Sequence, residues 1–243
     1  MRSNPFAVEA WFDHSVTLTF AVPLEELRQR LPSCLTPDAF DEKYGFVAVA
    51  IVKTRDLRPR GLPKCFGRDF ILIGYRYFVR YRDQNGRSLR GLLILRSETD
   101  KSQMVRLGNF FTSYHYIRTG IQLHAESDRL IADDPQTGLH IETDLNPSAD
   151  VPLPADSPFS DWREARRFCG PLPFTFSPDE HRREVRIIEG VRSNWKPNPV
   201  RILDWNIPFL DTLGFSEIKT ANAFIVRDIP YFWKRGRSES WTP

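Results

Sequence analysis

A β-hairpin centred on Asn85 and Gly86 constrains the fold of this chain more strongly than any other feature. Residues 70–81 (FILIGYRYFVRY) and 89–95 (LRGLLIL) flank it and are rich in β-branched and aromatic side chains. An Asn-Gly pair between two such runs is the strongest short signal for a hairpin, because both residue types tolerate positive φ. We therefore expect an antiparallel sheet around residues 70–95.

Further segments have the pattern of strands. Residues 16–22 alternate apolar and polar side chains, which predicts a half-buried strand, and a short helix should follow Pro23. Residues 46–52 are continuously apolar and predict a buried strand. Ser160 is expected to cap a helix that Gly170 and Pro171 end. More strands are expected at 114–123, 130–132, 138–143, 184–189 and 223–226.

Composition favours one folded domain over residues 1–243. Hydrophobic residues make up 41% of the chain and aromatic residues 13%, which is ample for a packed core. The longest apolar run, residues 46–52, is too short to cross a bilayer, and residues 1–12 lack the apolar core of a secretory signal. We therefore expect a cytoplasmic protein with no membrane partner.

The charge distribution gives no sign of a nucleic-acid partner. The formal net charge is only +3, and basic residues gather at 55–68 and 234–237 without the interleaved aromatic residues of a single-strand groove. No metal site is expected: His115 and His124 are nine residues apart, which places them on opposite faces of a regular strand. No cofactor motif occurs, so no cofactor is expected.

Three segments, in this order, resemble the acetoacetate decarboxylase-like superfamily: residues 18–32 (LTFAVPLEELRQRLP), 76–98, and 108–117 (GNFFTSYHYI). The runs ILRSETD (94–100), SNWKPNPV (193–200) and ANAFIVRDIPYFW (221–233) look more specifically like its YqjF-like family. The resemblance implies an α+β fold that is mainly antiparallel β. A curled sheet or barrel would enclose a cavity, with a few peripheral helices outside.

The resemblance also shows a missing catalytic group. The decarboxylases carry Tyr-Pro-Lys-Lys where this chain has Tyr114, His115, Tyr116 and Ile117. Their first lysine forms a Schiff base with the substrate ketone, and neither tyrosine nor histidine can form that iminium. Acidic residues expected near positions 48 and 72 are replaced by alanine and leucine. The chain should therefore not be a Schiff-base decarboxylase, and whether it is an enzyme at all stays open.

The segment around His115 supplies the candidate catalytic residues. In a regular strand Tyr114 and Tyr116 would share one face, where two phenols could polarise a carbonyl, and His115 would lie on the other as acid or base. Asn109, just before this segment, is a candidate ligand-binding residue. Trp195, within the family-like run at 193–200, is another.

Arg76 is the most unusual charge because it lies inside an apolar strand. A buried guanidinium needs a partner, and Glu98 at the end of the next strand is one candidate. The other is the carboxylate of a ligand, so Arg76 and Glu98 are both retained as ligand-binding candidates.

The leading functional hypothesis is a protein that binds, and as an enzyme transforms, a small molecule with a carbonyl or carboxylate group. The alternative is a non-catalytic sensor or carrier on a degenerate decarboxylase-like fold. Whether the protein forms a homo-oligomer is left open.

Overall fold

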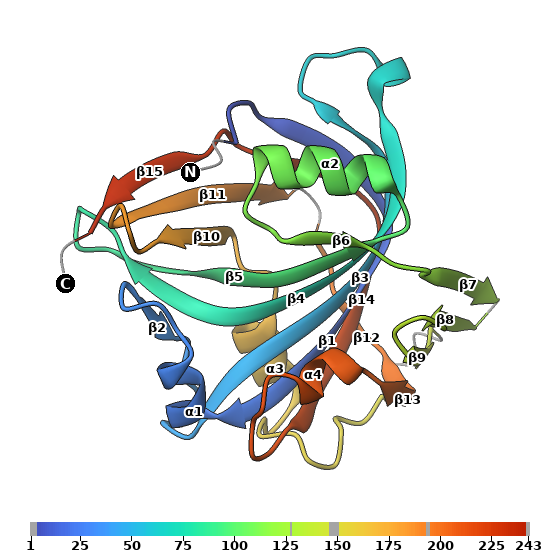
Figure 1. Cartoon of the computed structure of the whole chain (residues 1–243). Coiled ribbons are helices and arrows are strands. Elements are labelled where there is room, and N and C mark those ends of the chain that lie inside the picture. Colours follow the sequence, from blue (N-terminus) through green and yellow to red (C-terminus); the bar gives the residue numbers. More distant parts are fainter. Residues whose placement is uncertain (1–3, 127, 146–150, 193–194, 242–243) are drawn as a thin grey trace.

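The computed structural model describes residues 4–126, 128–145, 151–192 and 195–241. In these parts most strands belong to one large sheet (Figure 1): β1 (Val8–Pro23), β2 (Leu35–Pro37), β3 (Tyr44–Pro59), β4 (Arg68–Arg82), β5 (Ser88–Thr99), β6 (Tyr116–Arg118), β10 (Phe174–Asp179), β11 (Glu184–Arg192), β12 (Asn198–Pro199), β14 (Lys219–Trp233) and β15 (Arg237–Ser240). A second, smaller sheet contains β7 (Gln122–Glu126), β8 (Arg129–Asp134), β9 (Leu139–Asp144) and β13 (Arg201–Asn206). The helices are α1 (Leu24–Gln29), α2 (Ser102–Phe111), α3 (Trp162–Cys169) and α4 (Pro208–Asp211), with a 3-10 turn η1 at Lys64–Phe66.

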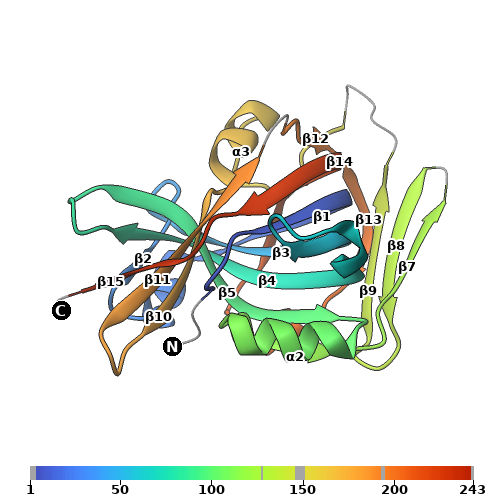
Figure 2. The ribbon, with the colours of Figure 1, turned by 90° about the horizontal axis from the view of Figure 1, so that it is seen from above.

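The large sheet closes into a ring of strands. Its order runs β14-β1-β3-β4-β5-β10-β11, and β11 also pairs with β14. Most pairs are antiparallel, while β5 pairs in parallel with both β10 and β6. Figure 2 shows α2 lying along one side of the ring and the smaller sheet beside it. The expected class, a mainly antiparallel α+β fold with few helices, is confirmed.

The hairpin that the sequence predicts is formed by β4 and β5, which pair from Arg82↔Ser88 onward. Its turn is organised by Asp83, whose carboxylate accepts hydrogen bonds from the backbone N–H groups of Asn85 (3.0 Å) and Arg87 (2.8 Å). Only Gly86 has a positive φ, of 76°. The loop is therefore longer than a two-residue Asn-Gly turn, because a side chain takes over part of the turn's hydrogen bonding.

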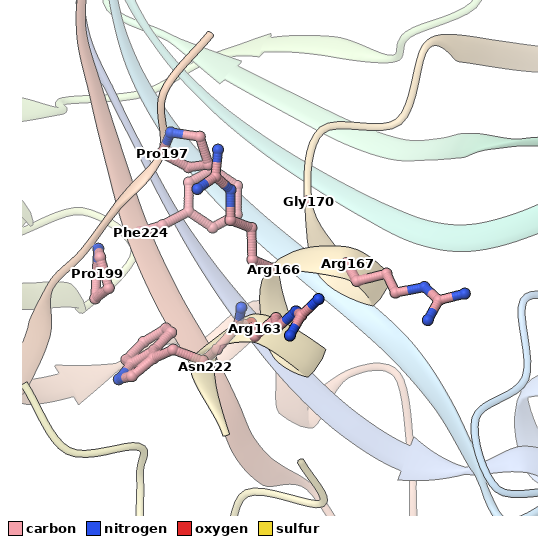
Figure 3. A pocket seen from close by; sticks show the side chains of 9 residues that line it. Arg163, Arg166, Arg167, Gly170, Pro197, Pro199, Asn222 and Phe224 are labelled. Carbon is pink, nitrogen blue, oxygen red and sulfur yellow. The ribbon is translucent and has the colours of Figure 1, made fainter. Parts of the chain in front are cut away.

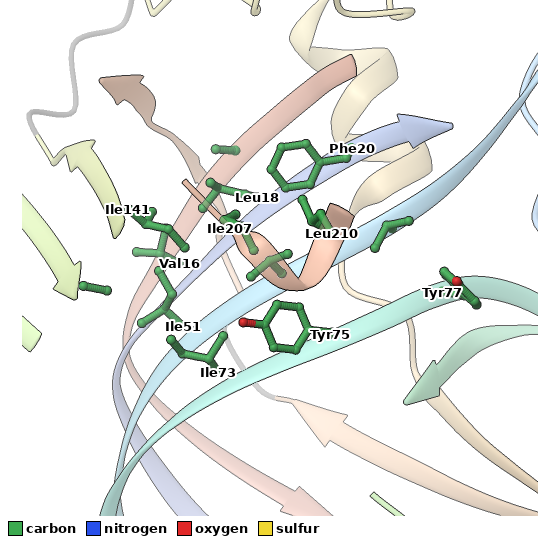
Figure 4. Close-up of a cluster of buried hydrophobic side chains, with 14 of the residues drawn as sticks. Val16, Leu18, Phe20, Ile51, Ile73, Tyr75, Tyr77, Ile141, Ile207 and Leu210 are labelled. Carbon is green, nitrogen blue, oxygen red and sulfur yellow. The ribbon is translucent and has the colours of Figure 1, made fainter. Parts of the chain in front are cut away.

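Strand β1 is buried on both faces, so the expectation of a half-buried strand is wrong. Val16, Leu18 and Phe20 are fully buried and pack on one face against α4 and the smaller sheet (Figure 4). On the other face Ser15 and Thr17 are also buried, with 5% and 9% exposure. Ser15 and Thr17 line a cavity inside the ring. The polar face of this strand therefore borders a cavity, and not solvent as expected.

The expected strand at 114–123 is instead two strands in two sheets. β6 pairs with β5 in the ring, and β7 pairs with β8 in the smaller sheet. His115 adopts φ 52°, a left-handed conformation that a regular strand cannot contain. The helix expected after Ser160 is α3, but Asp161 is its cap: the Asp161 carboxylate accepts from the Glu164 N–H at 2.7 Å.

No helix within the described ranges is long and apolar enough to span a membrane.

Candidate functional site

A cavity of about 140 Å³ lies inside the ring. Strands β1, β3, β4, β5, β10 and β14 all contribute to its wall, together with the segment that leads into β6. Most of the lining is apolar, as is usual for small-molecule sites. The polar lining groups include Ser15, Thr17, Thr54, Arg76, Ser97, Tyr114, Tyr116 and Thr175. Cavities of about 150 Å³ hold a molecule the size of benzene, so this volume fits a small head group.

Tyr114 and Tyr116 both reach this cavity, with ring centroids 6.4 Å apart. The ring of Tyr116 lies directly on the backbone of α2 at Gly108, where a Cβ would come within 2.5 Å of it. Asn109 fixes the backbone of Tyr116: its Nδ2 donates to the Tyr116 carbonyl (2.7 Å), and its Oδ1 accepts from the Tyr116 N–H (2.9 Å). Helix α2 therefore holds Tyr116 against the cavity.

The two phenols keep their protons at neutral pH. Burial raises the pKa of Tyr114 far above its usual value, and burial also raises the pKa of Tyr116 to about 12. The positive charge of Arg76, which lines the same cavity, opposes both pKa shifts. Burial likewise raises the pKa of the Cys169 thiol, which also lines the cavity. These groups are therefore hydrogen-bond donors and not bases.

Arg76 lines the cavity from β4 and is partly buried. Its guanidinium folds back over Gly74: a methyl group at position 74 would lie 2.9 Å from the Arg76 Nη2. The absence of a side chain at Gly74 thus leaves room for this charge beside the cavity.

The expected pair between Arg76 and Glu98 is corrected by the structure, in which Arg96 donates to Glu98 at 2.8 Å. Ile73, which pairs with Glu98 across the hairpin, belongs to the core on one face of β4, whereas Arg76 lines the cavity on the other. Successive residues of a strand point to opposite faces, so Glu98 and Arg76 lie on different sides of the sheet. Glu98 has 1% exposure and lies on the core side of the sheet, where burial raises its pKa.

His115 is exposed and is absent from the described cavity lining, which corrects its expected place as a catalytic acid or base. The left-handed backbone at this residue turns it away from the path of the strand. Its carbonyl accepts a hydrogen bond from the Ser97 N–H at 3.2 Å, so the residue helps to attach the β6 segment to β5.

The other expected site residues divide into two groups. Trp195 lines the cavity and packs edge-on against Tyr231, with centroids 6.5 Å apart. Asn109 does not line it and acts on Tyr116 instead. The neutral replacements at positions 48 and 72, Ala48 and Leu72, do line the cavity.

A second hollow of about 520 Å³ adjoins the cavity at Gly170 and Phe224, which contribute to both linings. Helix α3 supplies three arginines to it, Arg163, Arg166 and Arg167 (Figure 3). Figure 3 shows Arg166 extending toward Phe224 and Arg167 extending the opposite way. Within the described ranges no ion pair involves these three side chains. They form a positive surface beside the cavity that the sequence patterns did not identify.

The basic segment at 55–68 is partly neutralised by acidic residues. Arg55 pairs with Asp13, and Arg58 pairs with Glu9 and Asp56. Acidic side chains therefore compensate two of the basic residues of this segment. Among residues 4–126, 128–145, 151–192 and 195–241 no three His, Cys, Asp or Glu side chains gather as metal ligands.

Residues 9–237 match the model of the family DUF2071, described as an uncharacterized conserved protein. The chain belongs to this family. The expected YqjF-like family is thereby confirmed. No curated protein matches the sequence.

Solved structures show the same fold at low sequence identity. An acetoacetate decarboxylase from Legionella pneumophila is similar with a TM-score of 0.57 and 12% identity, over 96% of this chain and 87% of that one. An acetoacetate decarboxylase-like enzyme from Sphingomonas wittichii gives a TM-score of 0.60 and 11% identity, over 96% and 92%. The enduracididine biosynthesis enzyme MppR, complexed with pyruvate, gives 0.52 and 12%, over 96% and 90%.

Proposed function

We propose that the ring cavity binds a small organic acid that also carries a carbonyl group, such as a 2-oxo acid. The observation that carries this proposal is a single permanent positive charge, Arg76, acting on two protonated phenols, Tyr114 and Tyr116, at a small and mainly apolar cavity. A guanidinium suits a carboxylate because its planar fork can donate two parallel hydrogen bonds. The phenols donate to the carbonyl oxygen.

Two further features support an anionic ligand. The arginines of α3 create a positive potential beside the cavity, which attracts small anions. The volume of about 140 Å³ matches a molecule of about six non-hydrogen atoms, such as pyruvate. In addition, MppR has been solved complexed with pyruvate.

The proposed site acts without a Schiff base. No lysine occurs in the described lining of the cavity, and Lys101, the nearest lysine in sequence to the Tyr114 segment, is exposed and pairs with Asp100 at 2.9 Å. We expect no adduct when the protein is mixed with pyruvate and borohydride and then weighed by mass spectrometry. A stoichiometric mass increase on any lysine contradicts this statement.

The binding test compares Arg76→Met with Arg82→Met. Arg82 lies on the same strand, is exposed and is not part of the cavity lining, so it is a matched control. Hydrogen bonds to charged groups contribute about 1.5–3 kcal/mol, so Arg76→Met should weaken pyruvate binding about 10- to 150-fold in calorimetry. Arg82→Met should bind as the unmodified protein does. Equal affinities for the two variants, or no pyruvate binding by the unmodified protein, overturn the proposal.

A second comparison tests the phenols and distinguishes a carrier from an enzyme. The double variant Tyr114→Phe, Tyr116→Phe keeps both rings and removes both donors. It should lose about 10-fold in affinity for pyruvate and much less for propionate, which lacks the ketone. Chromatography of the ligand after incubation then shows whether it is consumed, as by an enzyme, or recovered unchanged, as from a sensor or carrier.

A further inference from the structure

An apolar groove of about 450 Å³ lies outside the ring, next to the cavity. One wall is formed by α2 through Met104, Leu107 and Phe111, and the other comes from the loop that contains Leu62 and Phe66. Three of these side chains are unusually exposed for large apolar groups: Leu62 by 42%, Leu107 by 42% and Phe66 by 55%. Exposed apolar groups that line one hollow mark a binding surface more often than scattered ones do.

The groove and the ring cavity share part of their walls. Leu57, Tyr114, Tyr116 and Trp233 line both spaces. The tyrosine pair thus borders both spaces. A ligand whose head group occupies the cavity has this groove as the adjoining space for the rest of the molecule.

Of the three cationic side chains in the described lining of the groove, Arg58 and Lys234 are paired with carboxylates, and Arg68 is exposed to solvent. Arg58 pairs with Glu9 at 2.5 Å, and Lys234 pairs with Glu189 at 2.9 Å. Arg68 donates to the Gly67 carbonyl at 3.1 Å. The remaining lining consists largely of hydrocarbon and aromatic groups, so the groove offers an environment for an apolar chain and little for a second carboxylate.

We infer that the ligand of this protein is a 2-oxo acid with an apolar chain, which lies in the groove between α2 and the loop at Leu62 and Phe66. This inference rests on the proposed function, because the polar end of the molecule is the one that Arg76 and the two tyrosines hold. The cavity of about 140 Å³ accommodates only that end. The chain passes the tyrosine pair and gains contact with Leu107 and Phe66.

The test measures the affinity of straight-chain 2-oxo acids, from pyruvate to about ten carbons, by calorimetry. Burial of one CH₂ group contributes about 0.8 kcal/mol, which equals about a 4-fold increase in affinity, so each added carbon should strengthen binding by about 2- to 4-fold in a partly open groove. The increase should persist beyond the length that the cavity alone can hold.

Variants of groove residues test where the apolar chain of the ligand lies. Leu107→Ser and, on the opposite wall, Phe66→Ser should abolish most of the increase with chain length and leave pyruvate binding unchanged. Phe110→Ser is the control, because Phe110 lies on the same helix, is 70% exposed and is not part of the groove lining. It should behave as the unmodified protein does. Thermal melting of each variant shows that it is folded.

The outcomes separate the two proposals. If pyruvate binds but affinity does not rise with chain length, the chain site is wrong and the cavity proposal stands. If no member of the series binds, the proposed function itself fails and this inference fails with it. If Leu107→Ser converts a dimer to a monomer in light scattering, the groove is an interface between two copies, and the chain site is again overturned.

Discussion

Asn109 and Tyr116 are joined by two hydrogen bonds, one donated and one accepted by the Asn109 amide. This clamp ties α2 to the cavity wall and adds to the packing of the Tyr116 ring on Gly108. We expect Asn109→Ala to lose about 2 kcal/mol of unfolding free energy, about 1 kcal/mol for each bond, and to weaken pyruvate binding. Asn109→Asp keeps the acceptor, so its unfolding free energy should lie between those of the unmodified protein and Asn109→Ala. Unchanged denaturant midpoints for Asn109→Ala contradict the clamp.

Two glycines on neighbouring strands should respond to alanine in opposite ways. A methyl group at Gly74 meets only the movable end of Arg76, so Gly74→Ala should unfold near the wild-type temperature but bind pyruvate weakly. A methyl group at Gly91 would lie 2.6 Å from the Phe174 carbonyl and 2.5 Å from the Phe176 ring. Because a backbone cannot move aside easily, Gly91→Ala should lose about 1–3 kcal/mol of stability. Calorimetric melting and titration of both variants check this contrast.

A buried carboxylate holds the β4–β5 hairpin to the segment after β2. The side chain of Asp38 is fully buried and accepts from the Nε of Arg80 at 2.6 Å and from the Nε of Arg90 at 2.7 Å. The Arg80 and Arg90 side chains keep 40% and 29% exposure, so water can solvate them when Asp38 is removed. Asp38→Ala should therefore cost about 1.5–3 kcal/mol in urea unfolding, as expected for lost hydrogen bonds to a charged group. Asp211→Ala, at an exposed position, should cost almost nothing.

Because of His14, the free energy of unfolding should depend on pH in the mildly acidic range. Burial, reinforced by the charge of Lys53, lowers the pKa of His14 from 6.5 to about 4. The unfolded chain therefore binds more protons than the folded one between these values, and stability falls as pH drops from about 6.5 toward 4. At about 1.4 kcal/mol per pKa unit, the loss reaches at most about 3.5 kcal/mol. His14→Gln should flatten the melting temperature across this window; an unchanged slope argues against His14 as the source.

The sequence predicts the hairpin, the core strands and the fold class because each rests on local patterns of polarity and turn residues. It also leads to the right segment for the cavity wall, since Tyr114, Tyr116 and Arg76 all line one space. It does not predict which side chains lie on the same face of the sheet. Across the hairpin Arg76 pairs with Ile94 and Glu98 with Ile73, and the alternation of side chains places Arg76 and Glu98 on opposite sides of the sheet.

Other misses involve partners distant in sequence or unusual backbone. His115 is exposed because its own backbone is left-handed. A sequence gives no sign of this conformation at a residue other than glycine. Asp38 finds its arginines 42 and 52 positions later, a separation that no spacing rule covers. The arginines of α3 adjoin the cavity only because residues Gly170 and Phe224, far apart in the chain, meet there.

The pairing of β1 with β14 joins the beginning of the described chain to its end, from Val8↔Trp233 to Ala21↔Lys219. During synthesis, the first strand therefore leaves the ribosome long before the strand that completes its pairing exists. Until then its unpaired edge and the apolar side chains of Val16, Leu18 and Phe20 have no permanent cover, which is the kind of exposure that chaperones recognise. Because the ring closes only when β14 is present, we expect this protein to fold slowly and late. A protein truncated a few strands short of the C-terminus should aggregate.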